Sequence, residues 1–338
     1  MTAFPTIAAF EAALADLRAP DTRAQEAARV RQAQLTKPAG SLGRLEEVAI
    51  FFAGWQGRER PRLDRGRAAI FAGNHGVTAH GVSAFPPGVT AQMVANFRAG
   101  GAAINALAAA AGLELTIVAL DLDRPTADFT AAPAMSDAEC LDALNAGAAT
   151  VDPDLDLILL GEMGIGNSTA AAALCARSFG GDAARWVGPG TGVDDQGVAR
   201  KVAVVERALA VHAYAAPSAF ETLRRVGGRE IAAMAGAALH ARRLGVPVLL
   251  DGFIGCAALA PLAVDNPAIT GHCLAGHCSA EPGHAALLAA LGLDPLLMLD
   301  MRLGEGSGGA VAAGVIRAAL AAHNQMATFA EAAVSGSL

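Results

Sequence analysis

The chain alternates short apolar runs with alanine-rich stretches, and this alternation constrains its fold more than any other feature. Each run is β-branched or leucine-rich and ends in Gly, Asp or Glu. The runs occupy residues 68–73, 115–121, 155–162, 185–190, 246–252 and 296–306. Apolar strands that alternate with helices indicate a parallel sheet covered on both faces, and right-handed crossovers make such a sheet doubly wound. We therefore expect an α/β fold with a mainly parallel sheet of about six strands.

The two ends of the chain differ from its middle. Residues 8–60 mix polar and apolar side chains with the spacing of two or three amphipathic helices. From residue 310 onward the sequence reads as an alanine-rich helix followed by a short tail. We expect both ends to form a small helical domain of residues 1–66 plus 317–338, beside a large catalytic domain of residues 67–316.

Composition excludes several classes of function. The net charge of −7 and the 17% of charged residues leave no basic surface for nucleic acid. The uncharged runs are shorter than the roughly 18 residues of a membrane-spanning helix, and Glu11 and Asp16 interrupt the N-terminal apolar stretch, so we expect neither a membrane segment nor a secretory signal. The five cysteines contain no C-x-x-C pair. They predict reduced thiols in a cytoplasmic protein.

Glycine is abundant, with 38 residues, whereas lysine occurs only at Lys37 and Lys201. Nearly every glycine-rich motif follows a predicted strand. Ligands of doubly wound sheets bind beyond the carboxyl ends of the strands. We therefore expect the backbone to approach a ligand at that edge of the sheet.

Residues 159–174, LLGEMGIGNSTAAAAL, combine a strand end, a glycine-rich turn and a helix start. Such a turn exposes N–H groups and the positive end of a helix dipole, which suit a phosphate or carboxylate. The alternative is an ordinary turn in which Asn167, Ser168 or Thr169 caps the helix. Glu162, placed where the strand ends, favours a functional site.

Residues 186–209, WVGPGTGVDDQGVARKVAVVERAL, form a second loop and helix. Adjacent Asp194 and Asp195 are Mg²⁺ candidates, but acids in a first helical turn complement the helix dipole, and we expect that simpler role. Lys201 is either a phosphate partner or a solvated helix residue. The spacing alone leaves both possibilities open.

Residues 71–97 are expected to form a long loop that contains His75, His80, Ser83 and Gln92. Loops of this length in a compact domain are usually functional. For His80 we expect a scaffolding role within the loop.

Residues 272–284, HCLAGHCSAEPGH, gather histidines and cysteines in the manner of a zinc site. Their spacing matches no familiar ligand pattern, so a metal is the less favoured interpretation. The alternative is that Ser279 and the turn at Glu281 and Pro282 touch the substrate.

Residues 299–316 place Glu305 between glycines after the last predicted strand. Gly304, Gly306 and Gly309 satisfy the dinucleotide pattern G-x-G-x-x-G, but no strand with a suitable acid follows, which argues against a nicotinamide cofactor. A carboxylate that a bound aromatic ring partly desolvates would have a raised pKa and could act as a general base near neutral pH. The alternative is an acid on a surface turn.

Several long motifs occur together in unbroken order between residues 37 and 316. They are KPAGSLGRLEE, GNHGV, GVSAFPPGVTAQM, GEMGIGNST, VGPGTGVDD, VLLDGFI, GHCSAEPGH and RLGEGSGGA. Together they resemble the nicotinate-nucleotide:dimethylbenzimidazole phosphoribosyltransferase family of cobalamin nucleotide-loop assembly. The resemblance implies that a base attacks C1′ of nicotinate mononucleotide, which releases nicotinate and gives α-ribazole 5′-phosphate. It also implies a Rossmann-like large domain and a homodimer whose partner helps to enclose each site.

The resemblance also implies roles for individual residues. Glu305 corresponds to the general base and Glu162 to a second active-site carboxylate. The residues implied to surround the benzimidazole are Ser83, Gln92, Met163 and Leu303. Those implied to contact the phosphoribose are Gly164, Gly190, Lys201, Gly252 and Ser279.

The chemistry agrees with these residue types. The departing ring of nicotinate mononucleotide is already a pyridinium, so it leaves without needing a proton, a metal or another cofactor. The attacking benzimidazole must lose its N–H proton, and one glutamate is enough to accept it. Two alternatives remain: a metal-dependent hydrolase that uses residues 272–284, and a nucleotide-binding regulatory module.

Overall fold

The computed structural model describes residues 2–215 and 217–335. Its strands are β1 (Gly66–Ala72), β2 (Leu113–Ala119), β3 (Leu157–Met163), β4 (Val248–Leu250), β5 (Cys273–His277) and β6 (Pro295–Leu297). They form one six-stranded sheet in the order β2-β1-β3-β4-β5-β6, and every neighbouring pair is parallel. The predicted α/β fold with a doubly wound parallel sheet is confirmed.

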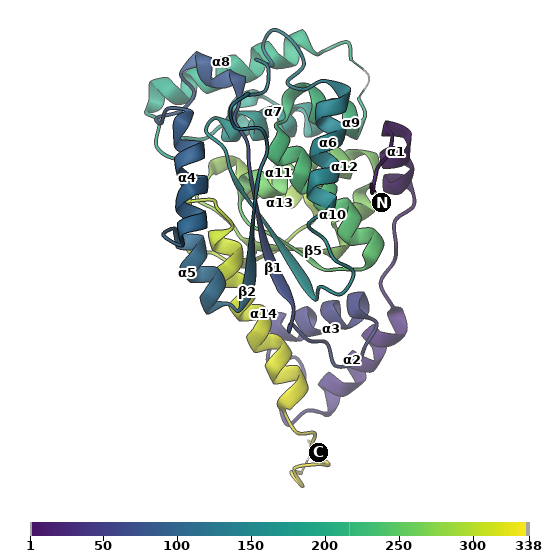
Figure 1. The fold of residues 1–338 in the computed structure, drawn as a ribbon. Helices are drawn as coiled ribbons and strands as arrows, with labels where there is room; N and C mark the ends of the chain where they lie inside the picture. Colours follow the sequence, from purple (N-terminus) through teal and green to yellow (C-terminus); the bar gives the residue numbers. More distant parts are fainter. Residues whose placement is uncertain (1, 216, 336–338) are drawn as a thin grey trace.

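Both faces of the sheet are covered, which explains why its strands are apolar on both sides. In β1, Ala69 and Phe71 belong to the hydrophobic core on one face, and Ala68 and Ile70 belong to the core on the other. This follows from the period of two in a strand. Figure 1 shows the sheet between two layers of helices.

The helices divide between the two faces. The first core includes α6 (Asp137–Ala148), α7 (Asn167–Phe179), α9 (Ala219–Val226), α10 (Arg229–Leu244), α11 (Phe253–Ala257), α12 (Ala260–Asp265) and α13 (Pro282–Leu291). The second includes α3 (Arg44–Gln56), α5 (Ala103–Ala110) and α14 (Ser307–Gln325). Helices α6 and α10 approach so closely that a methyl group on Gly147 or Gly236 would collide with the backbone of the other helix.

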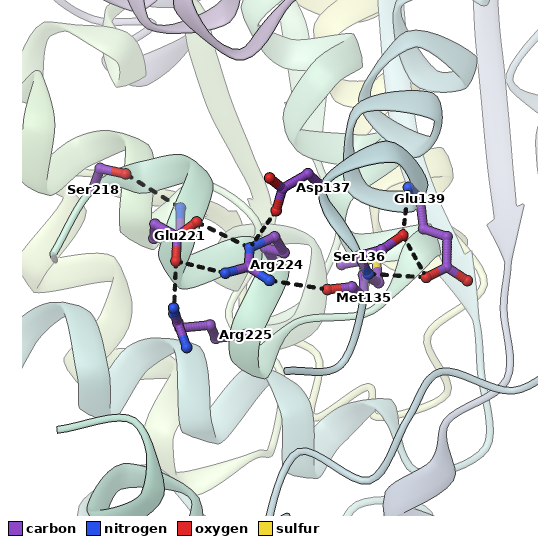
Figure 2. A network of polar contacts seen from close by, with 8 residues as sticks. All are labelled: Met135, Ser136, Asp137, Glu139, Ser218, Glu221, Arg224 and Arg225. Atoms are coloured by element: carbon purple, nitrogen blue, oxygen red, sulfur yellow. Dashed lines mark hydrogen bonds and ion pairs between the residues drawn. The ribbon is translucent and has the colours of Figure 1, made fainter. Parts of the chain in front are cut away.

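A polar network also joins α6 to α9 (Figure 2). The Arg224 guanidinium donates to Glu221 at 2.8 Å and pairs with Asp137 at 3.1 Å. At the start of α6, the N–H of Ser136 donates to Glu139, and this bond is the main cause that lowers the pKa of Glu139 to about 2. The network fixes the first turn of α6 against the neighbouring helix.

One of the six predicted strands is wrong. Residues 185–190 end a short 3₁₀ helix (Ala183–Arg185) and continue as a loop, in which Trp186 is buried and tilted against Phe179. The strand that the prediction lacked is β5, whose five residues are all buried. Its sequence, CLAGH, holds no β-branched residue. A methyl group on Gly276 would lie 2.9 Å from the Cα of Gly309, so this strand position needs glycine.

The prediction of a long loop over residues 71–97 is correct only for its first part, because its last part is helical. A 3₁₀ helix occupies Gly76–His80, and α4 begins at Gly88 and ends at Ala99. Thr90, Val94 and Phe97 are buried with the i, i+4, i+7 spacing of a helix face. The prolines and glycines that precede α4 obscured this spacing.

The chain ends form helices as predicted, namely α1 (Ile7–Ala15), α2 (Thr22–Gln34), α3 and α14. Figure 1 shows α2 and α3 beside the C-terminal half of α14, and α1 apart from them. The predicted boundary at residue 316 falls within α14, which is continuous. The domain division remains a prediction. Of the helices that the structure describes, none is long and apolar enough to cross a membrane.

Candidate active site

A cleft opens beyond the carboxyl ends of the strands, where parallel sheets of this kind bind ligands. It includes the residues that follow β3, β4 and β5, together with the loop that precedes α14. The space between its walls, including the open mouth, is about 850 Å³.

Most of the predicted site residues meet at this cleft. It is lined by Ser83, Glu162, Met163, Gly164, Gly190, Gly252, Ser279, Leu303 and Glu305. Gln92 is not part of the lining, because it lies exposed on α4. Lys201 is also outside the lining, for the different reason that it is buried behind the cleft wall.

Glu162 occupies the second-last position of β3 and is 7% exposed. Asn167 Nδ2 donates a hydrogen bond to its Oε2 atom. Burial, and then the nearby charge of Asp251, raise the pKa of Glu162 to about 8. This side chain is therefore a neutral acid at pH 7, with a proton available on its carboxyl group.

Glu305 lies in a tight turn before α14. Its φ is +62°, between Gly304 at +82° and Gly306 at +76°. The Ser307 hydroxyl closes the turn by donating to the carbonyl of Gly304 at 2.6 Å. Glu305 is 6% exposed, which rules out a surface turn, and burial followed by the charge of Asp251 raises its pKa.

The N-terminus of α7 forms part of the cleft wall through Gly166, Asn167 and Ser168. Lys201, on α8 (Asp195–Val211), lies behind this wall. Its ammonium donates to the Gly188 carbonyl at 2.6 Å and to Ser168 Oγ at 3.1 Å. Unpaired helix N–H groups next to a buried cation attract an anion. Burial lowers the pKa of Lys201, and the charge of Glu281 opposes that effect.

Three other polar residues named in the sequence analysis have structural partners, namely Asp194, His80 and His75. The Asp194 side chain caps α8 by accepting from Gly197 N–H at 2.8 Å, which confirms the predicted capping role. His80 Nε2 lies 2.7 Å from Asp128 Oδ2, which confirms scaffolding. His75 pairs with Glu230 at 2.6 Å behind the cleft, and both side chains are fully buried.

Residues 272–284 hold their histidines in separate contacts. His272 lies 2.9 Å from the carbonyls of Ile269 and Ala238, whereas His284 lies 2.9 Å from Ser279 Oγ. Burial lowers the pKa of His284 to about 3, so this ring is neutral. Across residues 2–215 and 217–335, no three His, Cys, Asp or Glu residues are grouped so as to hold a metal ion.

The sequence analysis missed Asp251, His277 and Arg302 as residues of this region. Asp251 directly follows β4 and is 1% exposed, and His277 ends β5 and lines the cleft. Asp251 follows its strand much as Glu162 ends β3, and this shared position was the available signal. His277 stood among the histidines of residues 272–284, but only as a candidate metal ligand, because β5 itself was not predicted.

Taken together, the cleft offers two kinds of surface. Its apolar wall is formed by Val82, Met163, Ile165, Phe253, Ile254 and Leu303. Its polar part combines two carboxyl groups whose pKa values are raised, those of Glu162 and Glu305, with the N-terminus of α7 near Lys201. Such a site can hold a flat apolar ring next to a proton acceptor while an anionic group binds a few ångströms away.

Comparison with known proteins supports this interpretation. A family model described as "Phosphoribosyltransferase" matches residues 17–334. A nicotinate-nucleotide:dimethylbenzimidazole phosphoribosyltransferase from Novosphingobium aromaticivorans is 71% identical over 338 residues and covers 100% of both chains. One from Mesorhizobium japonicum is 56% identical, over 98% of this chain and 99% of its own.

The fold agrees with the same relatives. The crystal structure of CobT from Thermus thermophilus has a TM-score of 0.86 and 42% identity, covering 93% of this chain and 99% of its own. The relative from Novosphingobium aromaticivorans has a counterpart for the whole of this chain. The chain therefore belongs to the nicotinate-nucleotide:dimethylbenzimidazole phosphoribosyltransferase family, which its sequence motifs resemble.

Proposed function

We propose that this enzyme transfers the 5-phosphoribosyl group of nicotinate mononucleotide to 5,6-dimethylbenzimidazole. The products are α-ribazole 5′-phosphate and nicotinate. The observation that carries the proposal is the placement of the buried Glu305 carboxyl group in one cleft with an apolar wall and with the N-terminus of α7. The names of the relatives that match this chain over its full length support the same pair of substrates.

Glu305 acts as the general base. The unprotonated nitrogen of the benzimidazole attacks C1′ while the bond between C1′ and the nicotinate nitrogen breaks. The electrons of that bond return to the pyridinium ring, and the benzimidazole N–H proton passes to the Glu305 carboxylate. The raised pKa of Glu305 suits a base that accepts a proton near neutral pH. Attack from the face opposite the leaving ring inverts a β-linked nucleotide to the α product.

The base binds along the apolar wall near Ser83, Met163 and Leu303. The phosphoribosyl group binds across Gly164, Gly190, Gly252 and Ser279. Lys201 acts from behind that surface, because its ammonium fixes Ser168 and the Gly188 carbonyl and adds a positive charge near the phosphate. Gln92 contacts the base only if α4 or its side chain moves, since it is exposed in this structure.

Glu162 is protonated at pH 7 and orients the reacting groups instead of accepting the proton. Because Asn167 donates to Oε2, the carboxyl proton resides on Oε1. From there it can donate a hydrogen bond to a substrate atom. This division of roles between two carboxyl groups follows from their different environments.

We also propose that the enzyme is a cytoplasmic homodimer. All five cysteines are free, and four are buried, which suits a reducing compartment. The loops that carry Ser83 and Leu303 expose large apolar side chains, with Met298 77% and Phe85 48% exposed. A partner subunit that covers this rim would also enclose the cleft. Sedimentation equilibrium tests the dimer, and a monomer at micromolar concentration would contradict it.

The activity is tested by mixing the purified enzyme with nicotinate mononucleotide and dimethylbenzimidazole and separating the products by chromatography. We expect equal amounts of nicotinate and α-ribazole 5′-phosphate, and a rate that a chelator does not change. Nicotinate release without dimethylbenzimidazole would identify a hydrolase. Binding of the nucleotide with no reaction in either mixture would identify a binding module.

A further inference from the structure

Asp251 joins the end of β4 to the start of α14. Its Oδ2 atom accepts a hydrogen bond from the N–H of Gly306 at 3.0 Å, and its Oδ1 atom accepts one from the N–H of Gly309 at 2.8 Å. The side chain is 1% exposed, so water cannot replace these bonds. Both N–H groups belong to the first turn of α14, where a helix leaves its donors without partners inside the helix.

The sequence of α14 cannot provide this cap. The N-cap residue is Gly306, which has no side chain to accept from the helix, and no other side-chain cap is present. Gly308 and Gly309 follow, and glycine is a weak helix former. Neither can be replaced cheaply, because a methyl group at Gly308 would collide with the His277 ring and one at Gly309 with Leu159. The start of this helix therefore depends on an acceptor from outside it.

The residue before this cap is Glu305, whose left-handed backbone is unfavourable for any residue with a Cβ atom. Such a conformation persists only where the surrounding contacts determine it. Two sets of contacts do so here: the Ser307 hydroxyl and the Ser307 N–H, both bonded to the Gly304 carbonyl, and Asp251 bonded to Gly306. Of these two, the second comes from a distant part of the chain.

We infer that Asp251 is the positioning residue for Glu305: by capping α14 from the end of β4, it holds the Glu305 carboxyl group in the cleft wall. Asp251 is not among the residues that line the cleft, so it acts through Glu305 and not on the substrates. The inference about position depends on the contacts above. The importance of Asp251 for turnover rests on the proposed function.

Asp251 also acts through its charge. Its carboxylate contributes to the raised pKa of both Glu305 and Glu162. The other charged and titratable groups around Glu305 are Glu162 at the end of β3, His277 at the end of β5, and Glu281 and Arg302 in the loops, with Glu230 behind the cleft. The pKa of Glu305 is raised by burial and by the charge of Asp251, and not by these other groups. Loss of the Asp251 charge therefore lowers that pKa.

The chain offers a matched control in Asp156. This residue is 5% exposed and accepts two backbone hydrogen bonds, from Asp64 at 2.8 Å and Arg65 at 2.9 Å. It directly precedes β3, so it lies at the edge of the sheet opposite to the cleft. D156N and D251N both replace a buried carboxylate that accepts backbone hydrogen bonds. In Asp156 both bonds end on Oδ2, an acceptor that asparagine can retain, and only D251N alters the support of Glu305.

The first measurement is amide hydrogen exchange, which needs no activity. In D251N, the amide that replaces one acceptor oxygen faces a backbone N–H and cannot bond to it. We expect the amides of residues 306–309 to exchange at least about tenfold faster in D251N than in the wild type, and unchanged in D156N. Equal protection in all three proteins would overturn the inference. D251S, which keeps one acceptor oxygen, replaces D251N if that variant does not fold.

The second measurement is the pH profile of nicotinate release. We expect D251N to lower kcat by roughly 10- to 100-fold, less than the 10²- to 10⁴-fold typical for loss of a general base itself. The acid limb of its kcat profile should move to lower pH, and the KM for dimethylbenzimidazole should change little. D156N should keep both kcat and the acid limb. If D251N lowered kcat with an unmoved acid limb, the role through charge would be wrong.

The two measurements separate this inference from the proposed function. If the wild type released no nicotinate but D251N loosened residues 306–309, Asp251 would still be the cap, and only the proposed activity would fail. If the wild type were active and D251N matched it in exchange and in kcat, the positioning role would fail and the proposed activity would stand.

Discussion

Asn167 donates a hydrogen bond to Oε2 of Glu162, which directly joins the start of α7 to the end of β3. In this bond Asn167 is the donor and Oε2 is the acceptor, so it can form whether or not Oε1 carries a proton. Burial and the charges of Asp251, Glu230 and Glu305 favour the protonated form. The Glu162 carboxyl group is therefore neutral at pH 7. At high pH it must ionise while buried, which lowers the stability of the fold.

We predict that E162Q stabilises the protein at high pH. The pKa of Glu162 rises from 4.5 in the unfolded chain to about 8 in the fold, so its stabilising effect is complete below 4.5 and is lost as the pH rises to 8. Glutamine keeps the acceptor for Asn167 and cannot ionise. Its Tm should exceed that of the wild type by roughly 3–6 °C at pH 9 and equal it at pH 4.5.

The matched control is E139Q, because the pKa of Glu139 is lowered to about 2. Its contribution is present above 4.5 and is lost as the pH falls toward 2. E139Q should therefore lower Tm at pH 9. An E162Q curve that runs parallel to the wild type across the whole range would contradict the raised pKa.

The two lysines allow a paired test of the phosphate site. K201M removes the positive charge behind the wall and the hydrogen bonds that fix Ser168 and the Gly188 carbonyl, and we expect the KM for nicotinate mononucleotide to rise by roughly 10-fold, which corresponds to about 1.4 kcal/mol. Lys37 instead pairs with Glu46 at 2.7 Å, with side chains 5% and 14% exposed. K37M should lower the denaturation midpoint and leave that KM unchanged. An unchanged KM in K201M would remove Lys201 from the phosphate site.

Substitution of Gly304 by alanine tests the conformation of the turn that carries Glu305. Its φ is +82°, and a methyl group there would lie 2.6 Å from Oε1 of Glu162. G304A should therefore destabilise the protein by about 1–2 kcal/mol through backbone strain and lower kcat at least tenfold by displacing the carboxyl groups. The control is G292A, at φ +65° with nothing within 4 Å of the new methyl group. It should have a similar loss of stability and full activity; two variants with the same kcat would disprove the close packing of Gly304 against Glu162.

The success and failure of the sequence predictions have physical causes. Strands β1, β2 and β3 are seven residues long, and each contains an uninterrupted apolar run, AAIFA, IVA and LILL respectively, which made them predictable. Strand β5 is short and is defined by what packs on it, namely Gly309 against Gly276. Residues 185–190 contain the apolar pair Trp186 and Val187, but Trp186 packs against Phe179 beside the sheet and not within it. Tertiary contacts decided both cases.

The site shows a similar division. Glu162 and Glu305 follow or end apolar runs, so the sequence placed them at the right edge of the sheet. Asp251 satisfies the same rule, yet its function as a cap depends on two backbone N–H groups more than 50 residues away in the chain. No local pattern encodes that contact. The burial of Lys201 was also beyond the sequence, because a cation on a helix is ordinarily solvated.

The central claim, that Glu305 accepts the proton of the base, is tested most directly by the rate of nicotinate release in E305Q. Glutamine keeps the size of the side chain and cannot accept the proton, so we predict a kcat lower by roughly 10²- to 10⁴-fold with the dissociation constant for dimethylbenzimidazole nearly unchanged. Glu139 is not among the residues that line the cleft, and E139Q should keep the wild-type kcat. An E305Q enzyme that releases nicotinate within threefold of the wild-type rate would contradict the account.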